Sequence, residues 1–403
     1  MTAILTLTLP LLAHEPDAAM GYILGGTGRL DGLLGTTAMT PPPLPAPAQT
    51  PAPTPVPPPA PTPAPPAIPP VSGPDTSAWV STARLAGLPA GSVLTLPAGT
   101  EQTMAHIPVP MTIRGAGMRS TIIDGQGGVG AGKRLAYGKG TIHGGGGVFL
   151  SDMGFINGGG ADGNSDGEAC VYLEGMDGTV TLLRLAFDGG TNAENGIFMQ
   201  NIKNAPIDAI VDSCVFEKNG ALGQSDGRSH CMYVSGRSVL VTRSIFHGKV
   251  NGNILKCRGP KMDVIDNPYI ARNNGRWIDT PGGCVVNSKG NTYVTLPEAS
   301  SSNALGFYDE NDDNANPGQP GSFTSANDTF YFSRGSETIW INNPNTRVEF
   351  ITPKIFWIGN PGATPPSVEI RGPGTLAGVN PFVFNDANRV ANAPPVPADP
   401  VAA

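Results

Sequence analysis

The chain has little charge and few aromatic residues for its length. Only 14% of its 403 residues are charged, 6% are aromatic, and the formal net charge is −7. It contains no run of basic residues, so the electrostatic footprint of a nucleic-acid-binding protein is missing. It also contains no stretch of roughly 20 consecutive apolar residues, which a membrane-spanning helix would need. The sequence therefore predicts a protein with no nucleic-acid partner and no membrane span.

Cysteine is scarce as well, and its spacing matches neither a disulfide framework nor a zinc site. Each cysteine falls in or beside a segment that is predicted to be a strand, where a free thiol acts as a small apolar core residue. An odd number of such thiols is easier to fold in a reducing cytoplasm than on an oxidising export route. The five residues are Cys170, Cys214, Cys231, Cys257 and Cys284.

Proline and glycine are abundant instead, with 42 and 54 residues. Seventeen of the prolines fall in residues 41–70. Such a Pro/Ala/Thr tract cannot pack a core and favours an extended polyproline II spacer. The composition predicts four segments, which are an N-terminal anchor (1–40), a proline-rich linker (41–75), a folded body (76–390) and a loose C-terminal tail (391–403).

Short alternating segments recur through the body in two series. In the first series, apolar or small residues alternate with aromatic, polar or charged ones, which is the pattern of a half-buried strand. The second series runs out of phase and ends on Phe155, Phe187, Phe216, Phe246 and Ile270. A unit that returns after about two dozen residues, with Gly and Asn between, is typical of a solenoid. The first series comprises residues 171–174, 197–200, 232–235, 255–258 and 278–281.

Two strand series per coil predict a parallel β-helix, because one coil cannot bury its inner face alone and must stack on its neighbours. An antiparallel sandwich is the alternative, but the two-residue Asn-Gly hairpin turns that it would use are scarce. Residues 76–87 begin with Thr and Ser and carry apolar residues near helical spacing. They predict a helix that caps the N-terminal end of the solenoid.

Residues 90–99, 111–117 and 121–125 resemble the first coils of the right-handed parallel β-helix proteins of the pectate-lyase type. The resemblance covers about residues 76 to 390. It implies an all-β, right-handed parallel β-helix. It implies less about activity, since the group includes lyases, hydrolases, epimerases and the tailspike-like spikes of bacteriophage virions.

Stacking of the coils places the outward residues of the first series in two columns. Neighbouring coils lie about 4.8 Å apart, so three aromatic residues would form a ridge that leads to charged side chains. Exposed ring faces beside hydrogen-bonding charges suit a glycan. Ladder packing explains the same pattern, and the ridge could equally lie beneath a loop or a neighbouring subunit. The candidate glycan-contacting residues are Tyr172, Phe198, Tyr233, Glu174 and Gln200.

Charged residues follow the ridge and are the candidates for catalysis. Lys256 and Asp279 lie one coil apart, which predicts a salt bridge if both point outward. In a lyase of the resembled group, a Lys or Arg removes the proton beside a uronate carboxyl group and another cation neutralises that carboxylate. Lys256 and Arg258 are candidates for these two roles, and His230 could assist. The loop that carries Asp226 and ends at His230 should overhang the ridge, although a simple Asp-Gly turn explains it slightly better.

A hydrolase would need two carboxyl groups about 5 to 9.5 Å apart. Asp279 with Asp309, or Asp226 with Glu194, could come that close across adjacent coils. Calcium is a candidate cofactor but not a required one, since the lyases of this group gather two or three acidic residues and the strands here offer only Glu174 and Asp279. A second candidate cation site, which a solvated turn explains better, is formed by Asp162, Asp166 and Glu168.

Together these features favour a homotrimeric virion spike that binds, and could depolymerise, the polysaccharide of a bacterial surface. Residues 1–40 would attach it to other virion proteins by strand addition, and assembly would take place in the host cytoplasm. A secreted polysaccharide lyase or epimerase is the alternative. It would use about the first 20 residues as a signal peptide, although these lack basic residues before the apolar stretch. A non-catalytic adhesin or structural fibre is the third candidate.

Overall fold

The computed structural model describes residues 82–400, apart from 103–104, 126–139, 159–168, 175–176, 189–194, 200–206, 218–229, 248–251, 274, 298, 300–302, 309–319 and 334. The anchor (1–40) and the linker (41–75) lie outside the described residues. Among the described residues, helical structure is confined to α1 (Thr82–Ala86) and the short 3₁₀ turn η2 (Asp386–Asn388). Neither helix is long and apolar enough to cross a membrane.

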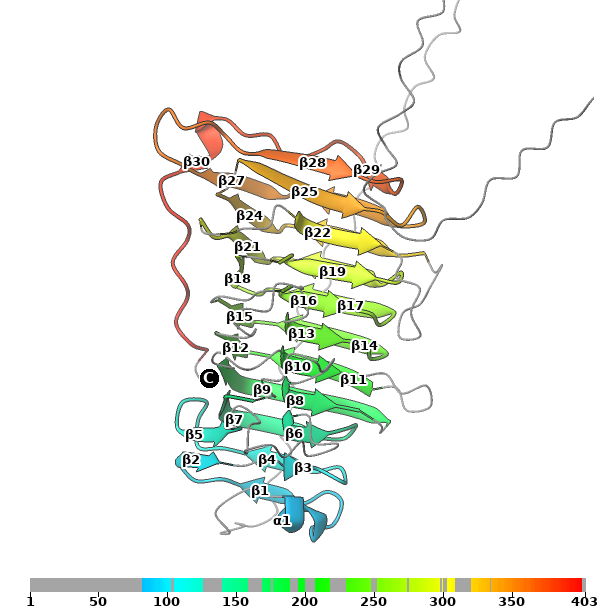
Figure 1. Cartoon of the computed structure of the whole chain (residues 1–403), viewed down its shortest axis with the longest axis vertical. Coiled ribbons are helices and arrows are strands. Elements are labelled where there is room, and N and C mark those ends of the chain that lie inside the picture. Colours follow the sequence, from blue (N-terminus) through cyan, green and yellow to red (C-terminus); the bar gives the residue numbers. More distant parts are fainter. Residues whose placement is uncertain are drawn as a thin grey trace, which may run out of the picture. The chain divides into compact units, whose positions relative to one another are not determined.

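Ten strands form one sheet, and each pairs in parallel with the strand of the next coil (Figure 1). We call it the ten-stranded sheet. Its strands are β3 (Ala105–His106), β6 (Gly140–Gly144), β8 (Ala169–Leu173), β10 (Asn195–Met199), β13 (His230–Val234), β16 (Leu255–Cys257), β19 (Ile278–Pro281), β22 (Asn303–Tyr308), β25 (Ser336–Ile341) and β28 (Ser367–Arg371).

A 20-stranded sheet forms the rest of each coil and consists of two columns. The first column comprises β1 (Val93–Thr95), β4 (Thr112–Arg114), β7 (Phe149–Ile156), β9 (Gly178–Asp188), β11 (Ile207–Asp212), β14 (Ser238–Thr242), β17 (Lys261–Ile265), β20 (Val285–Lys289), β23 (Ser322–Ala326), β26 (Arg347–Ile351) and β29 (Thr375–Ala377). The second comprises β2 (Gly99–Gln102), β5 (Thr121–Asp124), β12 (Val215–Phe216), β15 (Ile245–Phe246), β18 (Tyr269–Arg272), β21 (Thr292–Thr295), β24 (Thr329–Phe332), β27 (Lys354–Ile358) and β30 (Arg389–Val390). Strands β7 and β9 run through both columns.

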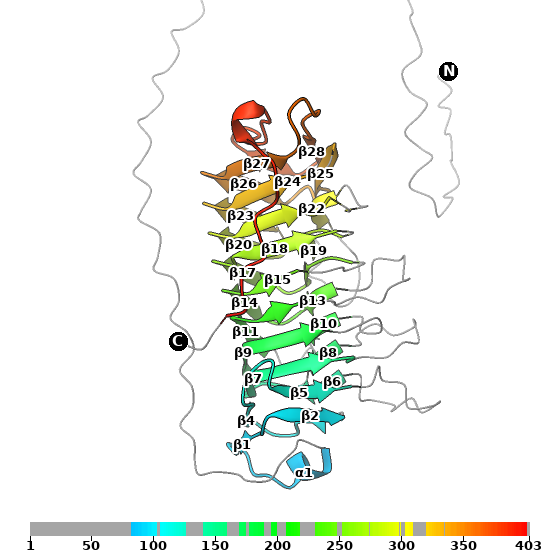
Figure 2. The same cartoon turned by 90° about the vertical axis from the view of Figure 1, so that its left-hand side faces the viewer.

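Each coil thus contributes three strand positions, and the pairings between coils are parallel. Connections between parallel strands of one sheet are right-handed as a rule. The chain is therefore an all-β, right-handed parallel β-helix, as its sequence predicts. Helix α1 lies at the N-terminal end of the stack, where its Leu85 is buried in the core (Figures 1 and 2).

A one-residue bend separates the two columns of the 20-stranded sheet. The backbone of the residue at the bend has φ between 48° and 69°. Residues other than glycine seldom adopt this left-handed region. The bend lets both flanking strands keep their pairing with the coils on either side. From β11 onward it also explains why each segment of the second sequence series is divided into two strands. The bend residues are Asp152, Arg184, Ser213, Arg243, Asp266, Gly290, Asn327 and Thr352.

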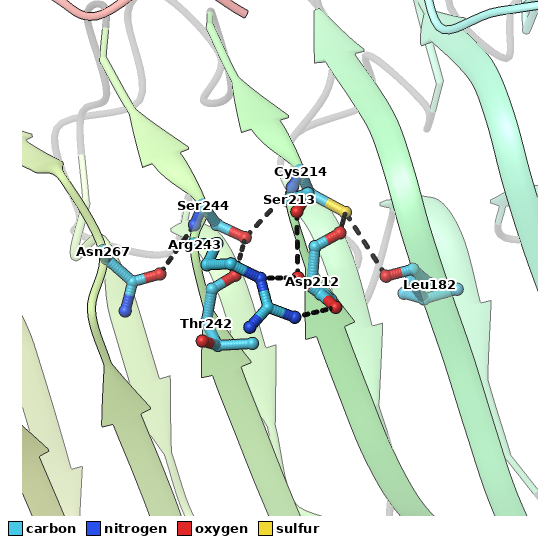
Figure 3. A network of polar contacts seen from close by, with 8 residues as sticks. All are labelled: Leu182, Asp212, Ser213, Cys214, Thr242, Arg243, Ser244 and Asn267. Atoms are coloured by element: carbon cyan, nitrogen blue, oxygen red, sulfur yellow. Dashed lines mark hydrogen bonds and ion pairs between the residues drawn. The ribbon is translucent and has the colours of Figure 1, made fainter. Parts of the chain in front are cut away.

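Buried polar side chains directly after the bend form a ladder between coils. The side-chain oxygens of Ser244, Asn267, Asn291 and Asp328 each accept the backbone N–H of the preceding rung. From Cys214 onward, these four N···O distances are 3.1, 2.9, 3.0 and 2.7 Å. Figure 3 shows the first two of these hydrogen bonds. The ladder gives a hydrogen-bond acceptor to backbone N–H groups that would otherwise be buried without one. Burying such a group without a partner costs about 1–3 kcal/mol.

Replacing Asn267 with Ala should lower the free energy of unfolding by about 2–4 kcal/mol, because two buried backbone groups lose their partners. Asn267 accepts from the Ser244 N–H at 2.9 Å and donates to the Val241 carbonyl at 3.1 Å. Urea denaturation measures the change. Asn287 is the matched control, since it bonds Asp263 on the exposed face at 2.7 Å. Asn287→Ala should change stability by no more than about 0.5 kcal/mol, and equal losses in both variants would contradict the ladder.

The interior of the second column is filled by stacked phenylalanine rings. Phe155, Phe187, Phe216 and Phe246 lie one above another, with centroids 5.4, 4.7 and 4.5 Å apart. All four are fully buried. The end positions of the second sequence series therefore point inward, as the alternation predicts, and the aromatic stack holds successive coils in register.

Beyond β30 the chain runs back along the outside of the second column (Figures 1 and 2). Ala393 packs against an apolar cluster on that outer face, which includes Val215 and Ile245. The Asp399 carboxylate accepts from Arg119 Nε at 2.8 Å, and Arg119 Nη1 donates to Glu217 at 2.7 Å. Within the described part of the segment that composition predicts to be a loose tail, Ala393 and Asp399 therefore contact the solenoid.

Candidate functional site

The outward residues of the ten-stranded sheet form one column across successive coils. Strand register pairs Tyr172 with Phe198, and Phe198 with Tyr233. It then pairs Tyr233 with Lys256, and Lys256 with Asp279. The predicted aromatic ridge and the charged residues that follow it are therefore neighbours in space.

The three rings are stacked face to face along the axis of the solenoid. Their centroids lie 5.2 Å (Tyr172–Phe198) and 4.8 Å (Phe198–Tyr233) apart, with interplanar angles of 21° and 22°. Tyr172 and Phe198 are only 6% and 7% exposed, whereas Tyr233 is half-buried. Ring faces in this arrangement contact each other and not solvent. Tyr172 and Phe198 thus offer no open face to a sugar, and ladder packing, the alternative named above, accounts for both rings.

Glu174 lies at the edge of this stack and is half-buried. Burial of the Tyr172 hydroxyl, together with the Glu174 carboxylate beside it, raises the pKa of Tyr172 well above its usual range. A raised tyrosine pKa means that the hydroxyl stays protonated. Tyr172 and Glu174 therefore form a neutral donor paired with an anionic acceptor at one end of the column.

Two cations lie against the other end of the ring stack. Lys256 Nζ is 5.4 Å from the Tyr233 ring centroid, and Arg258 Cζ is 5.5 Å from it. The distances are those of cation–π contacts, which are stronger where water is excluded. The Lys256 side chain is 12% exposed and Arg258 is 9% exposed. Phe198 and the two cations therefore lie against the ring of Tyr233.

Asp279 is fully buried beside Lys256. Its Oδ1 accepts from Arg276 Nη1 at 2.8 Å, and its Oδ2 accepts from Asn253 Nδ2 at 2.7 Å. Lys256 Nζ lies 3.8 Å from Oδ2, so the predicted Lys256–Asp279 salt bridge is present. A carboxylate without exposed surface cannot reach a glycosidic bond. Asp279 is therefore placed to hold the cations in position, and not to act as the acid or nucleophile of a hydrolase.

A glycine on the next coil makes room for this arrangement. Gly306 pairs with Asp279 in the column. A Cβ at this position would lie 2.7 Å from Arg276 Nε and 3.0 Å from Asp279 Oδ1. The missing side chain thus lets the Arg276 guanidinium fold across the column and reach the carboxylate.

A second polar ladder, beside the column, positions these residues. The Oδ1 atom of Asn195 accepts a hydrogen bond from the backbone N–H of His230 at 3.2 Å. His230 Nδ1 accepts from the backbone N–H of Asn253 at 3.0 Å. Asn253 Oδ1 in turn accepts from the backbone N–H of Arg276 at 2.9 Å. Sequence reasoning missed this ladder, although a signal was present. Each of its four residues stands two positions before a segment of the first strand series.

His230 is held as a neutral imidazole within the ladder. Only an unprotonated Nδ1 can accept the Asn253 N–H, so the proton of the neutral ring belongs on Nε2. Burial, and then the positive charge of Lys256, lower the pKa of His230 well below its usual value, and the cations Arg258 and Arg276 act in the same direction. The imidazole is 1% exposed and lies 5.6 Å from the Tyr233 ring. The buried imidazole therefore positions Asn253 and packs beside Tyr233, and it is not exposed to a ligand.

This lowered pKa predicts a loss of stability in mild acid. The unfolded chain binds a proton at His230 near pH 6.5, but the folded chain does so only at lower pH. The stabilisation is complete above about pH 6.5 and declines by about 1.4 kcal/mol per pH unit as the pH falls toward the folded pKa. Urea denaturation between pH 7.5 and about 5 measures this slope.

His230→Asn is the matched variant, because Asn Oδ1 occupies the same branch position as His Nδ1 and cannot be protonated. It should keep the ladder at pH 7.5 and remove the contribution of position 230 to the pH slope. His230→Ala should be less stable at both pH values, by about 1–3 kcal/mol at pH 7.5. A slope in His230→Asn equal to that of the parent protein would contradict this role.

The other residues that the sequence predicts as candidates for glycan binding, catalysis or cation binding lie outside the described residues. These are Gln200, Asp226, Asp309, Glu194, Asp162, Asp166 and Glu168. Within the described part of the chain, no group of three or more His, Cys, Asp or Glu side chains gathers as metal ligands.

Comparison with known proteins gives one distant likeness of fold. No family model matches the chain, and no curated protein sequence matches it. Among solved structures, the chain is similar to pectin methylesterase from carrot, with 11% sequence identity and a TM-score of 0.38. The match covers 77% of this chain and 91% of the carrot enzyme.

Proposed function

We propose that the protein binds an anionic polysaccharide of a bacterial surface on the outer face of its ten-stranded sheet. The observation that carries this proposal is a cluster of three cations at Tyr233 and Asp279. Lys256 and Arg276 lie against the buried Asp279 carboxylate, and Lys256 and Arg258 lie over the Tyr233 ring. All three cations lower the pKa of His230, which indicates a positive potential at this position. Carboxylate or sulfate groups of a glycan are the ligands that suit such a potential.

The solenoid supports the same proposal, because it presents a repeating, extended face. Coils follow at about 4.8 Å, and a linear polymer can lie along several of them at once. The Tyr233 hydroxyl, which can both donate and accept a hydrogen bond, would contact sugar hydroxyl groups. Arg258 would pair with an acidic group of the glycan, since a guanidinium binds carboxylates in a bidentate fashion.

We further propose that the protein serves as a virion spike, attached through residues 1–40 and assembled as a homotrimer in the host cytoplasm. This part rests on the sequence, namely the proline-rich linker and the free cysteines of the strands. Light scattering of the full-length chain tests it. A trimer is expected, and a monomer would contradict the spike.

The glycan proposal is tested by binding of the full-length protein to a panel of acidic and neutral bacterial polysaccharides. One acidic polysaccharide should bind, and Arg258→Ala should raise its Kd about 10-fold or more, which is about 1.4 kcal/mol. Lys354→Ala is the control, since Lys354 is exposed on the other sheet, and its Kd should not change. Binding of neutral glycans with equal affinity, or no change in Arg258→Ala, would contradict the proposal.

Elimination chemistry is a second candidate for the same residues. It is favoured by Lys256 and Arg258, which lie against one ring and could act as base and clamp. The base would remove the proton beside a uronate carboxyl group, a C=C bond would form, and the glycosidic oxygen would leave. New ultraviolet absorbance, lost in Lys256→Ala, would establish a lyase. If the protein binds the glycan but does not shorten it, the elimination proposal is wrong and the binding proposal stands.

A further inference from the structure

Two thiols of the core lie in direct contact. Cys257 Sγ and Cys284 Sγ are 3.2 Å apart, with the Cys284 thiol donating to the Cys257 sulfur. Both residues are reduced and are 0% and 2% exposed. A disulfide bond is about 2.05 Å long, so a closure of about 1 Å would join them.

Their contact follows from the path of the chain between two coils. Cys257 ends β16 with its side chain directed into the core, and β16 pairs with β19 of the next coil. The chain leaves β19 through Gly282 and Gly283, whose φ values of 104° and 77° suit glycine alone. This turn brings Cys284 back beside Cys257 before β20 begins, so the two thiols belong to successive coils.

We propose that Cys257 and Cys284 are a cross-linking site, reduced while the protein folds and closed to a disulfide when the folded protein meets a two-electron oxidant such as hydrogen peroxide. The first thiolate attacks the peroxide, so that an S–O bond forms, the O–O bond breaks and hydroxide leaves. The second sulfur then attacks the sulfenic sulfur, so that the S–S bond forms and the oxygen leaves as water. The two thiols lose two electrons and two protons, and one peroxide becomes two waters.

The reaction is slow in the folded protein. Burial, and then the neighbouring Cys257 thiol, raise the pKa of Cys284 well above its usual range. Thiolate is the reactive form and is therefore scarce. The disulfide should therefore form only during long exposure to the oxidant, so the pair stabilises the fold and does not act as a rapid redox switch.

The cross-link would fix the strand that carries the candidate site. Cys257 stands between Lys256 and Arg258 in sequence, and its side chain points inward while theirs contact Tyr233 on the outside. A bond from Cys257 to the next coil ties the backbone of β16 to the turn before β20. The site residues would then stay in place at temperatures at which the reduced coils begin to separate.

Purified full-length protein is incubated with hydrogen peroxide and then analysed by intact mass and by proteolytic mapping without reductant. The expected product is a Cys257–Cys284 peptide pair and a mass loss of about 2 Da per molecule. Thermal unfolding should shift upward by several degrees and return after dithiothreitol. Cys257→Ser and Cys284→Ser should show neither change. Cys170→Ser is the matched control, since Cys170 is also buried in the core, and it should still form the cross-link.

Several outcomes would overturn the proposal. One is pairing of Cys257 or Cys284 with a different cysteine. Another is oxidation of single thiols to sulfinic acid without a cross-link. A cross-link that leaves the thermal midpoint unchanged would overturn the stabilising role. If a serine variant fails to fold, mapping of the unsubstituted protein alone decides between these results.

Discussion

Replacing Arg272 with Met should lower the free energy of unfolding by about 3–5 kcal/mol, because it leaves the carboxylate of Glu337 buried without its cation. Arg272 and Glu337 form an ion pair in the interior, and both side chains are fully buried. Arg272 Nη1 also donates to the Gly275 carbonyl at 3.1 Å, and its guanidinium lies 5.0 Å from the Trp277 ring centroid. The pair joins β18 of the 20-stranded sheet to β25 of the ten-stranded sheet across the core.

A double-mutant cycle separates this pair from simple loss of packing. Arg272→Met together with Glu337→Leu should be less destabilising than the sum of the two single variants, since apolar side chains of similar volume can replace a buried pair. The exposed pair Arg237–Asp208 is the control. Arg237→Met should change stability by about 1 kcal/mol or less. Additive losses in the buried pair would show that the two charges do not depend on each other.

Replacing Asp279 with Ala should abolish glycan binding and lower the free energy of unfolding by about 3–5 kcal/mol. The carboxylate is the common partner of Arg276, Lys256 and Asn253, and without it two cations face each other in a poorly hydrated site. Urea denaturation and polysaccharide binding are measured on the same preparation, at a temperature at which the variant is folded.

Asp279→Asn separates charge from shape in this cluster. The amide keeps an oxygen acceptor for Arg276 but removes the negative charge, so stability should fall less than in Asp279→Ala. Asp263→Ala is the control, because Asp263 pairs with Lys261 on the outer face of the other sheet. It should leave binding unchanged. Full binding by folded Asp279→Ala would remove Asp279 from the site.

The alternation in the sequence predicts which residues of the site share a column, because side chains of a strand alternate between two faces. Tyr172, Phe198, Tyr233 and Lys256 therefore follow in order. The pattern cannot tell whether a ring shows its face or its edge. Stacking at the spacing of the coils turns the faces toward each other. The sequence pattern suggests an aromatic surface open to sugars. The rings of Tyr172 and Phe198 instead pack against each other and are buried.

The polar ladder through His230 shows a different limit. Asn195, His230 and Asn253 occupy equivalent positions at or just before the start of their strands, but Asn and His at a strand start also suit an ordinary turn. Only the stacked coils bring each side-chain acceptor to the N–H of the next coil. The same holds for Cys257 and Cys284, whose 27-residue separation has no meaning until the coil closes.

The sequence by itself determined the solenoid, since the alternation within each strand and the return of the unit along the chain can both be read without knowing any contact between coils. It also determined which residues point outward on the ten-stranded sheet. The tertiary structure alone decided the one-residue bend between the two columns, the burial of Asp279 among three polar partners, and the contact of Ala393 and Asp399 with the solenoid. These depend on the distance between residues of different coils, which is set when the coils pack and not by the residues that alternate along each strand.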